Sequence, residues 1–311
     1  MTVRIVTDST CDLSPELAQQ LGIIVVPVYL RFGDEVYRDG VDISQDEFYQ
    51  KLVESPIHPT TSQPPPSDFA DVYSKLSQEA DEIVSIQVTS KLSGTYNSAL
   101  QGRELAETGC RIEVVDSLST SMGLGLIVMA AARLAEAGES LQGVMEEVRQ
   151  AIPSIRVLGV FDTLKYLAKG GRLGKAKALL GTLLNVKPLI TMRDGELFPA
   201  GQVRTRSKGI DRLFDFVKNA LNIQELAIVH STTLDEASSL RERIGSIFDK
   251  KRIHIARLGP ALGVHAGPGA LILALREKVS GIGQEAGEGE PSKKAFSLPS
   301  LHIPKLRFSH P

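Results

Sequence analysis

Short apolar runs rich in β-branched residues recur along the first half of the chain and alternate with segments of helical periodicity. Runs of this kind, bounded by turn residues, are typical of buried strands. We expect strands at Val3–Thr7, Ile23–Val28, Ile83–Val88, Arg111–Val115 and Val157–Phe161, with helical patterns around Asn97–Glu107 and Leu126–Ala135 between the later ones. Because parallel strands need a crossover connection, usually a helix, this alternation predicts a parallel sheet in an α/β fold.

Capping and turn residues mark several element ends. The tripeptide Ser14-Pro15-Glu16 supplies an N-cap, a proline in the first turn and an acidic residue, so it predicts a helix start. Ser44 with Glu47 three residues later is typical of a capping box. Gly33-Asp34 predicts a hairpin turn. The segment 56–66 holds five prolines, and we expect it to be extended because proline fixes φ.

The pattern changes after about Ala151. Asp194-Gly195 lies between the apolar segments Pro188–Met192 and Leu197–Val203 and is a hairpin signal, which predicts a mixed sheet. Further on, we expect a helix over Leu234–Phe248, flanked by strands at Leu226–His230 and Arg252–Arg257, and a closing strand at Ala270–Leu275.

This pattern predicts two α/β domains with a ligand between them. We place an N-terminal parallel-sheet domain at residues 1–155 and a C-terminal mixed-sheet domain at 156–280. Residues 281–311 are rich in glycine, proline, serine and lysine without periodicity, and we expect a disordered tail there. A cleft between two domains is a common place for a ligand.

Composition and charge exclude several classes of protein. The 311 residues are 42% hydrophobic, and 35 Lys and Arg against 37 Asp and Glu leave no basic excess for nucleic acid. Cys11 and Cys110 form no C-x-x-C pair, which favours a reducing compartment and a cytoplasmic address. The uncharged stretch Leu258–Leu275 is interrupted by glycine and proline, so we expect a structured loop and no stable membrane insertion.

Small hydroxyl residues gather where strands end. Such segments are Ser9-Thr10, Thr60-Thr61-Ser62, Thr89–Thr95 and Asp116-Ser117. In parallel α/β sheets these ends converge on the ligand crevice, although each hydroxyl taken alone more often caps a helix. Ser93 is the stronger candidate for ligand binding, because it precedes Gly94 at a helix start that favours an anion such as a carboxylate. Thr61 and Ser62 lie on a chain stiffened by proline, where a hydroxyl loses little entropy on binding; a rigid connector is the alternative.

His265 and a set of arginines are the remaining polar candidates. His265 lies in a glycine-dense loop where the imidazole can donate to an anion, although a lone histidine is usually structural. No second histidine or cysteine pair accompanies it, so we expect no metal. The segment 167–176 fails as a phosphate loop, with Lys169 and Ala176 at the deciding positions. We expect Arg172, Arg204 and Arg206 to be mobile and exposed, which suits the docking of a phosphorylated ligand or an acidic partner, and a solvated basic surface is the alternative.

Several motifs together resemble the DegV family of bacterial fatty-acid-binding proteins, from Val3 to about Leu275. The motifs are Ile5-Val6-Thr7-Asp8-Ser9-Thr10, Thr60-Thr61-Ser62-Gln63-Pro64, Ser90-Lys91-Leu92-Ser93-Gly94-Thr95-Tyr96, Val115-Asp116-Ser117, Gly170-Gly171-Arg172 and His265-Ala266-Gly267-Pro268-Gly269-Ala270. The chain departs from the family at Leu271-Ile272-Leu273, where another glycine is expected.

The resemblance implies a carrier without catalytic residues or cofactors. A long-chain fatty acid would lie in a buried apolar tunnel, its carboxylate held by Thr61, Ser93 and His265 with Ser62 close by. The carrier would present the acid to a separate ATP-dependent fatty acid kinase, which makes the acyl-phosphate used in phospholipid synthesis. Arg172, Arg204 and Arg206 would dock the kinase or handle phosphate.

Two points stay open at the level of sequence. The apolar helices Leu124–Ala135 and Leu179–Leu184 are candidates for the tunnel wall, and ordinary core is the more common role for such residues. The second functional hypothesis is a subunit similar to the substrate domain of dihydroxyacetone kinase, in which His265 would hold a small carbonyl compound covalently. Transcriptional regulation has no helix-turn-helix signature behind it.

Overall fold

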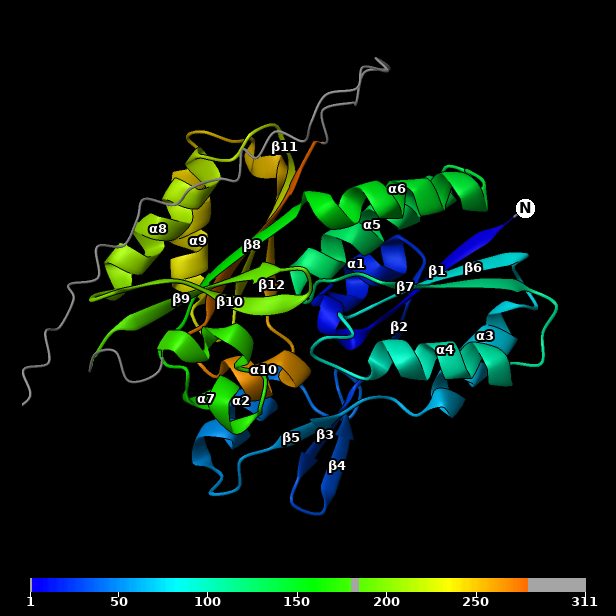
Figure 1. Cartoon of the computed structure of the whole chain (residues 1–311), viewed down its shortest axis with the longest axis horizontal. Helices are drawn as coiled ribbons and strands as arrows, with labels where there is room; N and C mark the ends of the chain where they lie inside the picture. Colours follow the sequence, from blue (N-terminus) through cyan, green and yellow to red (C-terminus); the bar gives the residue numbers. More distant parts are fainter. Residues whose placement is uncertain (1, 180–184, 279–311) are drawn as a thin grey trace, which may run out of the picture. The chain divides into compact units, whose positions relative to one another are not determined.

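The computed structural model describes residues 2–179 and 185–278. Its first sheet contains four parallel strands in the order β2-β1-β6-β7 (Figure 1). The strands are β1 (Val3–Asp8), β2 (Ile23–Val26), β6 (Glu82–Gln87) and β7 (Arg111–Asp116). Each pair is in parallel register, for example Ile5 with Ile23 and Val84 with Glu113. The predicted parallel sheet is therefore confirmed.

Helices cover both faces of this sheet. Helices α3 (Pro66–Leu76) and α4 (Thr95–Leu105) lie on one side, where Phe69 and Tyr73 pack against strand residues such as Ile83 (Figure 1). Helices α1 (Pro15–Gln20), α5 (Met122–Glu136) and α6 (Leu141–Ser154) belong to the core on the other side. Pro15 begins α1 after the Ser14 cap, as predicted. Helix α6 was not predicted.

A small three-stranded antiparallel sheet is inserted between β2 and α3. It contains β3 (Tyr29–Phe32), β4 (Glu35–Arg38) and β5 (Thr60–Ser62), with the β3–β4 hairpin turning at the predicted Gly33-Asp34. Helix α2 (Gln45–Glu54) begins with the complete Ser44–Glu47 capping box. In the proline-rich segment, Thr60–Ser62 are extended, as expected, and form β5 as an edge strand, whereas Pro66 already begins helix α3.

The second sheet is mixed and has the order β10-β9-β8-β13-β11-β12. Its strands are β8 (Ile155–Val160), β9 (Lys187–Arg193), β10 (Glu196–Val203), β11 (Ile223–His230), β12 (Ile253–Arg257) and β13 (Leu271–Glu277). The β9–β10 hairpin turns at Asp194-Gly195, as predicted. Strand β13 is the last of the chain's described strands, and it lies inside the sheet, antiparallel to β8 and β11. Residues 271–273 are fully part of this strand despite the missing glycine.

Helices α8 (Arg206–Lys218) and α9 (Leu234–Ile244) pack on one face of the second sheet through Leu213, Val217 and Leu240. Helix α9 agrees with the predicted element, and α8 was not predicted. The chain leaves the first sheet's helices and enters the second sheet at Ile155. The domain boundaries near this point stay a prediction, and the tail 281–311 lies outside the described residues.

Helix α5 belongs to two cores at once. Leu124, Ile127 and Val128 pack with the first sheet, whereas Leu126 and Met129 pack with the second. A helix that is apolar all round is expected to be buried all round. Of the two roles that the sequence left open for this helix, ordinary core is the one that the structure supports, since its residues do not border the cavity described below. The second candidate for the tunnel wall was the segment Leu179–Leu184. Leu179 does not border the cavity, and residues 180–184 lie outside the described part of the chain.

Candidate ligand site

A cavity of about 370 Å³ lies between the carboxyl ends of the parallel strands and one face of the second sheet. This volume is within the range of small-molecule sites. One part of its apolar wall comes from the second sheet, where Gly159 is paired with both Ile190 and Ile272 and Leu197 is paired with Met192. Directly paired residues share a face, so these side chains form one continuous apolar surface.

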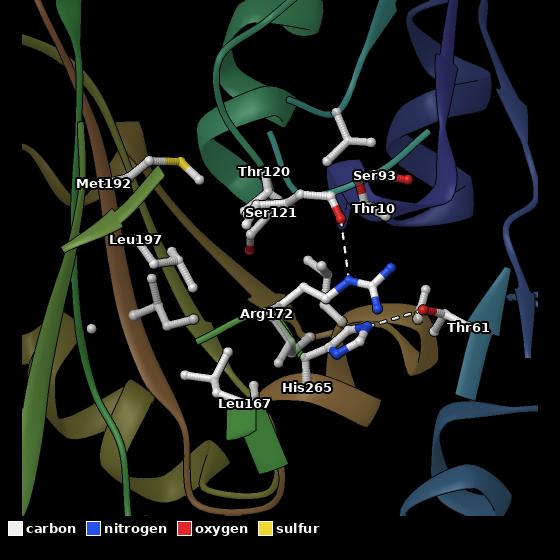
Figure 2. A pocket seen from close by; sticks show the side chains of 18 of the residues that line it. Thr10, Thr61, Ser93, Thr120, Ser121, Leu167, Arg172, Met192, Leu197 and His265 are labelled. Atoms are coloured by element: carbon white, nitrogen blue, oxygen red, sulfur yellow. Dashed lines mark hydrogen bonds between the residues drawn. The ribbon is translucent and has the colours of Figure 1, made fainter. Parts of the chain in front are cut away.

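Thr61 and His265 meet on the wall of the cavity. Thr61 lies on β5, and His265 lies in the last turn of helix α10 (Pro260–Ala266). Their Oγ1 and Nε2 atoms are 3.0 Å apart, which is a hydrogen bond (Figure 2). The sequence predicted a loop around His265, and this is wrong for residues 260–266. Pro260 fits a first helical turn, and Gly267, with φ of 72°, ends the helix, so the irregular segment begins after Ala266.

The His265 imidazole is neutral in this setting. Burial, with the nearby charge of Arg172 and of His58, lowers its pKa to about 4. Its second ring nitrogen, Nδ1, faces Gly170 and has no hydrogen-bond partner among the described residues. A Cβ at Gly170 would lie 2.1 Å from Nδ1, so position 170 must be glycine for the ring to occupy this place. The first glycine of the sequence motif Gly170-Gly171-Arg172 is thus required for steric reasons.

Ser93 lies just before helix α4, as expected. Its Oγ accepts a hydrogen bond from the backbone N–H of Thr95 and lies 2.8 Å from the Thr95 hydroxyl. Ser93 and Ser62 both border the cavity. Gly94 packs against the side chain of Gln63, so the Ser93 loop and the end of β5 lie against each other. Thr61, Ser62, Ser93 and His265, which are separated by up to 204 residues in sequence, are thereby brought to one cavity.

Arg172 also borders the cavity. Its guanidinium donates from Nε to the carbonyl of Leu92 (3.2 Å; Figure 2) and from Nη1 to the carbonyl of Gly170 (2.8 Å). The expectation of a mobile, exposed side chain is wrong for Arg172, because both of these hydrogen bonds fix it next to Ser93 and His265. The Arg172 guanidinium therefore supplies a positive charge next to the uncharged His265 imidazole.

The other two arginines lie away from the cavity wall. Arg206 is 19% exposed and is paired with Glu236, and its Nη1 donates to the carbonyl of Gly269. The expectation of exposure is therefore also wrong for Arg206, since Glu236, thirty residues along the chain, holds it in place. Arg204 is exposed, as expected.

Sequence reasoning missed part of the polar wall. Thr120 and Ser121, in the connection between β7 and α5, border the cavity together with Thr10. Thr10 belongs to a segment that the sequence did indicate, whereas nothing in the linear pattern distinguished Thr120 or Ser121. Behind this wall, Asp8 and Asp12 are buried and accept hydrogen bonds from Thr10 and Ser121.

No group of three or more histidine, cysteine, aspartate or glutamate side chains within residues 2–179 and 185–278 is arranged to hold a metal ion. In the same part of the chain, no helix is both long enough and apolar enough to cross a bilayer.

Comparison with known proteins identifies the family. The family model described as "Uncharacterised protein, DegV family" matches residues 2–278. The chain belongs to the DegV family. A DegV domain-containing protein of Caldanaerobacter subterraneus is 37% identical over 279 residues, which cover 89% of this chain and 99% of the relative. One from Deinococcus radiodurans is 36% identical over 282 residues, covering 88% and 98%.

Solved DegV structures share the fold. A DegV family protein from Thermus thermophilus, described for its fatty acid binding, superimposes with a TM-score of 0.82 at 35% identity and covers 89% of this chain and 100% of its own. DegV of Bacillus subtilis, described as a fatty acid binding protein, gives 0.80 at 28% identity, with 89% and 100% covered. A stearic acid-binding protein of Eubacterium ventriosum gives 0.80 at 29%, with 88% and 98% covered. The two-sheet α/β fold is thus that of DegV proteins.

Proposed function

We propose that this chain binds a long-chain fatty acid in the cavity, with the carboxylate at Thr61, Ser93 and His265 and with Ser62 beside them. The observation that carries the proposal is a largely apolar cavity with a hydrogen-bonded Thr61–His265 pair and Ser93 on its wall. DegV structures described as binding fatty acids support the same ligand class.

The acyl chain would supply most of the affinity. Burying about 14 methylenes at about 0.8 kcal/mol each contributes on the order of 11 kcal/mol, before the cost of ordering the ligand. The apolar face formed by β8, β9 and β13 suits this role, because it presents no hydrogen-bonding side chain at Gly159, Ile190 or Ile272.

The head group would be held by hydroxyl donors near a fixed positive charge. A neutral imidazole protonated at Nε2 donates to Thr61 Oγ1 and leaves the Thr61 proton free for the carboxylate. This tautomer also leaves an acceptor, and not an N–H, unpaired against Gly170. Arg172 then balances the carboxylate charge from the same wall.

We further propose that the chain is a non-catalytic carrier in the cytoplasm. It would present the bound acid to an ATP-dependent fatty acid kinase, whose acyl-phosphate product enters phospholipid synthesis. Arg172 on the cavity wall and the exposed Arg204 are suited to phosphate or partner contact. Arg206 would act mainly through its pair with Glu236, because its guanidinium is already engaged.

The test is a titration of the lipid-free protein with radiolabelled stearic acid. Thr61→Val removes the hydroxyl at nearly constant volume, and we expect an affinity loss of about tenfold or more, as for a hydrogen bond to a charged group. Thr60→Val is the matched control, because Thr60 is exposed on the same strand and does not border the cavity. Equal affinities for both variants and the unmodified protein would contradict the assignment of Thr61. A covalent adduct of a small carbonyl compound on His265 would instead support the dihydroxyacetone-kinase-like alternative.

A further inference from the structure

The apolar wall on the second sheet is arranged in successive rows. Alternate residues of a strand share a face, and Phe161, Gly159 and Val157 all border the cavity. At about 3.3 Å per residue, Val157 lies about 13 Å along the chain from Phe161. The register of β8 with β9, in which Gly159 pairs with Ile190, puts Met192 beside Val157. The wall therefore has a first row at Phe161, a middle row at Gly159 and a last row at Val157 and Met192.

The first row lies at the head-group end of the cavity. Strand β13 begins shortly after helix α10, which carries His265, and its first residues pair with the end of β8 next to Phe161. In the view of Figure 2, Met192 lies on the opposite side of the cavity from Thr61 and His265. The last row is thus the part of this wall that lies farthest from the proposed carboxylate site.

The cavity is closed at the last row. Met192 and Leu197 are directly paired across the β9–β10 hairpin, and both border the cavity. Because β10 is the edge strand and both residues are only half-buried, the pair lies between the cavity and solvent. Beyond Val157, β8 packs directly on α5, where a Cβ at Gly123 would lie 3.2 Å from Val157 and 3.3 Å from Ile155. Ile155, the next residue on this face, does not border the cavity.

We propose that the Met192–Leu197 pair determines which length of acyl chain this protein prefers, because the methyl end of the ligand meets it. The inference rests on the proposed fatty acid binding and extends it to selection among acids of different length. Each methylene that is buried along the wall raises the affinity about fourfold. A methylene that would pass the pair must displace it or stay in water, so it adds no affinity.

The test is a competition assay in which saturated fatty acids, from lauric to behenic acid in steps of two carbons, displace cis-parinaric acid from the lipid-free protein. We expect the affinity to rise with chain length and then to level off at one length, which we call the break point. The measured quantity is the affinity of the next longer acid relative to the acid at the break point of the unmodified protein.

Two substitutions at Met192 should move the break point in opposite directions. Met192→Ala removes three side-chain atoms, so we expect the relative affinity of the next longer acid to rise about tenfold. Met192→Trp adds bulk at the same place and should move the break point to a shorter acid. Leu262→Ala is the matched control, because Leu262 borders the same cavity near His265 and also loses three atoms. We expect it to weaken all acids by a similar factor and to leave the break point in place.

A break point that neither Met192 variant moves, or that Leu262→Ala moves equally, would overturn the proposal. Affinity that increases through the whole series without a break point would also overturn it. Failure of every acid to displace the probe from the unmodified protein would be a different result, because it would refute the proposed fatty acid binding as a whole. Circular dichroism and melting temperature establish that each variant is folded before the profiles are compared.

Discussion

The two walls of the cavity come from two different sheets, one from the edge of the first sheet and the other from a face of the second. The first sheet contributes its carboxyl edge, where loops after β1, β6 and β7 place Thr10, Ser93 and Thr120. The second sheet contributes a face, on which Gly159, Ile190 and Ile272 stand in register. An edge ends in loops with free backbone groups and short polar side chains, whereas a buried face carries apolar side chains. One cavity thereby acquires a polar and an apolar side, which suits an amphipathic ligand.

The largest expected effect comes from filling the apolar wall. A Cβ at Gly159 would lie 2.9 Å from a ring carbon of Phe161 and 3.0 Å from Ile272, so Gly159→Val must displace neighbours or occupy the cavity. We expect the affinity for stearic acid to fall more than tenfold in the titration assay. Gly109→Val is the control, since nothing lies within 4 Å of a Cβ there. Unchanged stearic acid affinity in Gly159→Val would mean that the acyl chain does not lie on this face.

Substitutions on the polar wall distinguish residues that bind the fatty acid from residues that act in its presentation to the kinase. Ser93→Ala removes a donor to the carboxylate, and we expect about a tenfold loss of affinity and a parallel loss of phosphorylation by an added fatty acid kinase. Arg172→Ala should reduce lipid retention less than Ser93→Ala does and still impair the kinase reaction. If Arg172→Ala released the lipid as completely as Ser93→Ala, the assignment of Arg172 to phosphate or partner contact would be wrong.

The remaining expected effect is a pH dependence of the folding stability that comes from His265. Because burial lowers its pKa to about 4 from an ordinary value near 6.5, the unfolded chain binds more protons than the folded chain between these values. The stability contributed by the neutral imidazole is complete above pH 6.5 and is lost as the pH falls towards 4. Buried Asp12 and Asp39 have raised pKa values and act in the opposite direction, so their effect must be removed by difference.

Denaturant unfolding of the unmodified protein and His265→Gln provides this difference, because the aspartates are common to both. We expect the difference in free energy of unfolding to be constant above pH 6.5 and to change in favour of the variant as the pH falls to 4. A difference independent of pH over this range would show that the imidazole is not kept neutral by burial.

Local sequence signals predicted the elements well, and tertiary contacts account for most of the errors. The capping box at Ser44 and the hairpin at Asp194-Gly195 depend on neighbouring residues and are confirmed. Helix α10 was hidden because its glycines and its proline resemble a loop when read without the packing of Gly263 against Phe48. The all-round apolar pattern of α5 indicates burial on every side, but it does not reveal that two different sheets cover the helix.

The residues of the site show the same difference between local sequence signals and tertiary contacts. Thr61, Ser93 and His265 were indicated by local motifs and by the family resemblance, and the structure brings them to one cavity. The exposure of Arg206 was predicted wrongly because its partner Glu236 lies on another helix. Thr120 carries no local signal, since its position on the cavity wall depends on how the folded chain brings the β7–α5 connection to the second sheet.

The most direct test of the central claim is the identity of what the protein carries. Purified recombinant protein is denatured, extracted with organic solvent and analysed by mass spectrometry against a known amount of chain. The account predicts about one long-chain fatty acid per chain in the unmodified protein, given the apolar surface available for burial, and a much smaller amount in Gly159→Val. Release of polar metabolites in place of acyl chains, at the same stoichiometry, would contradict it.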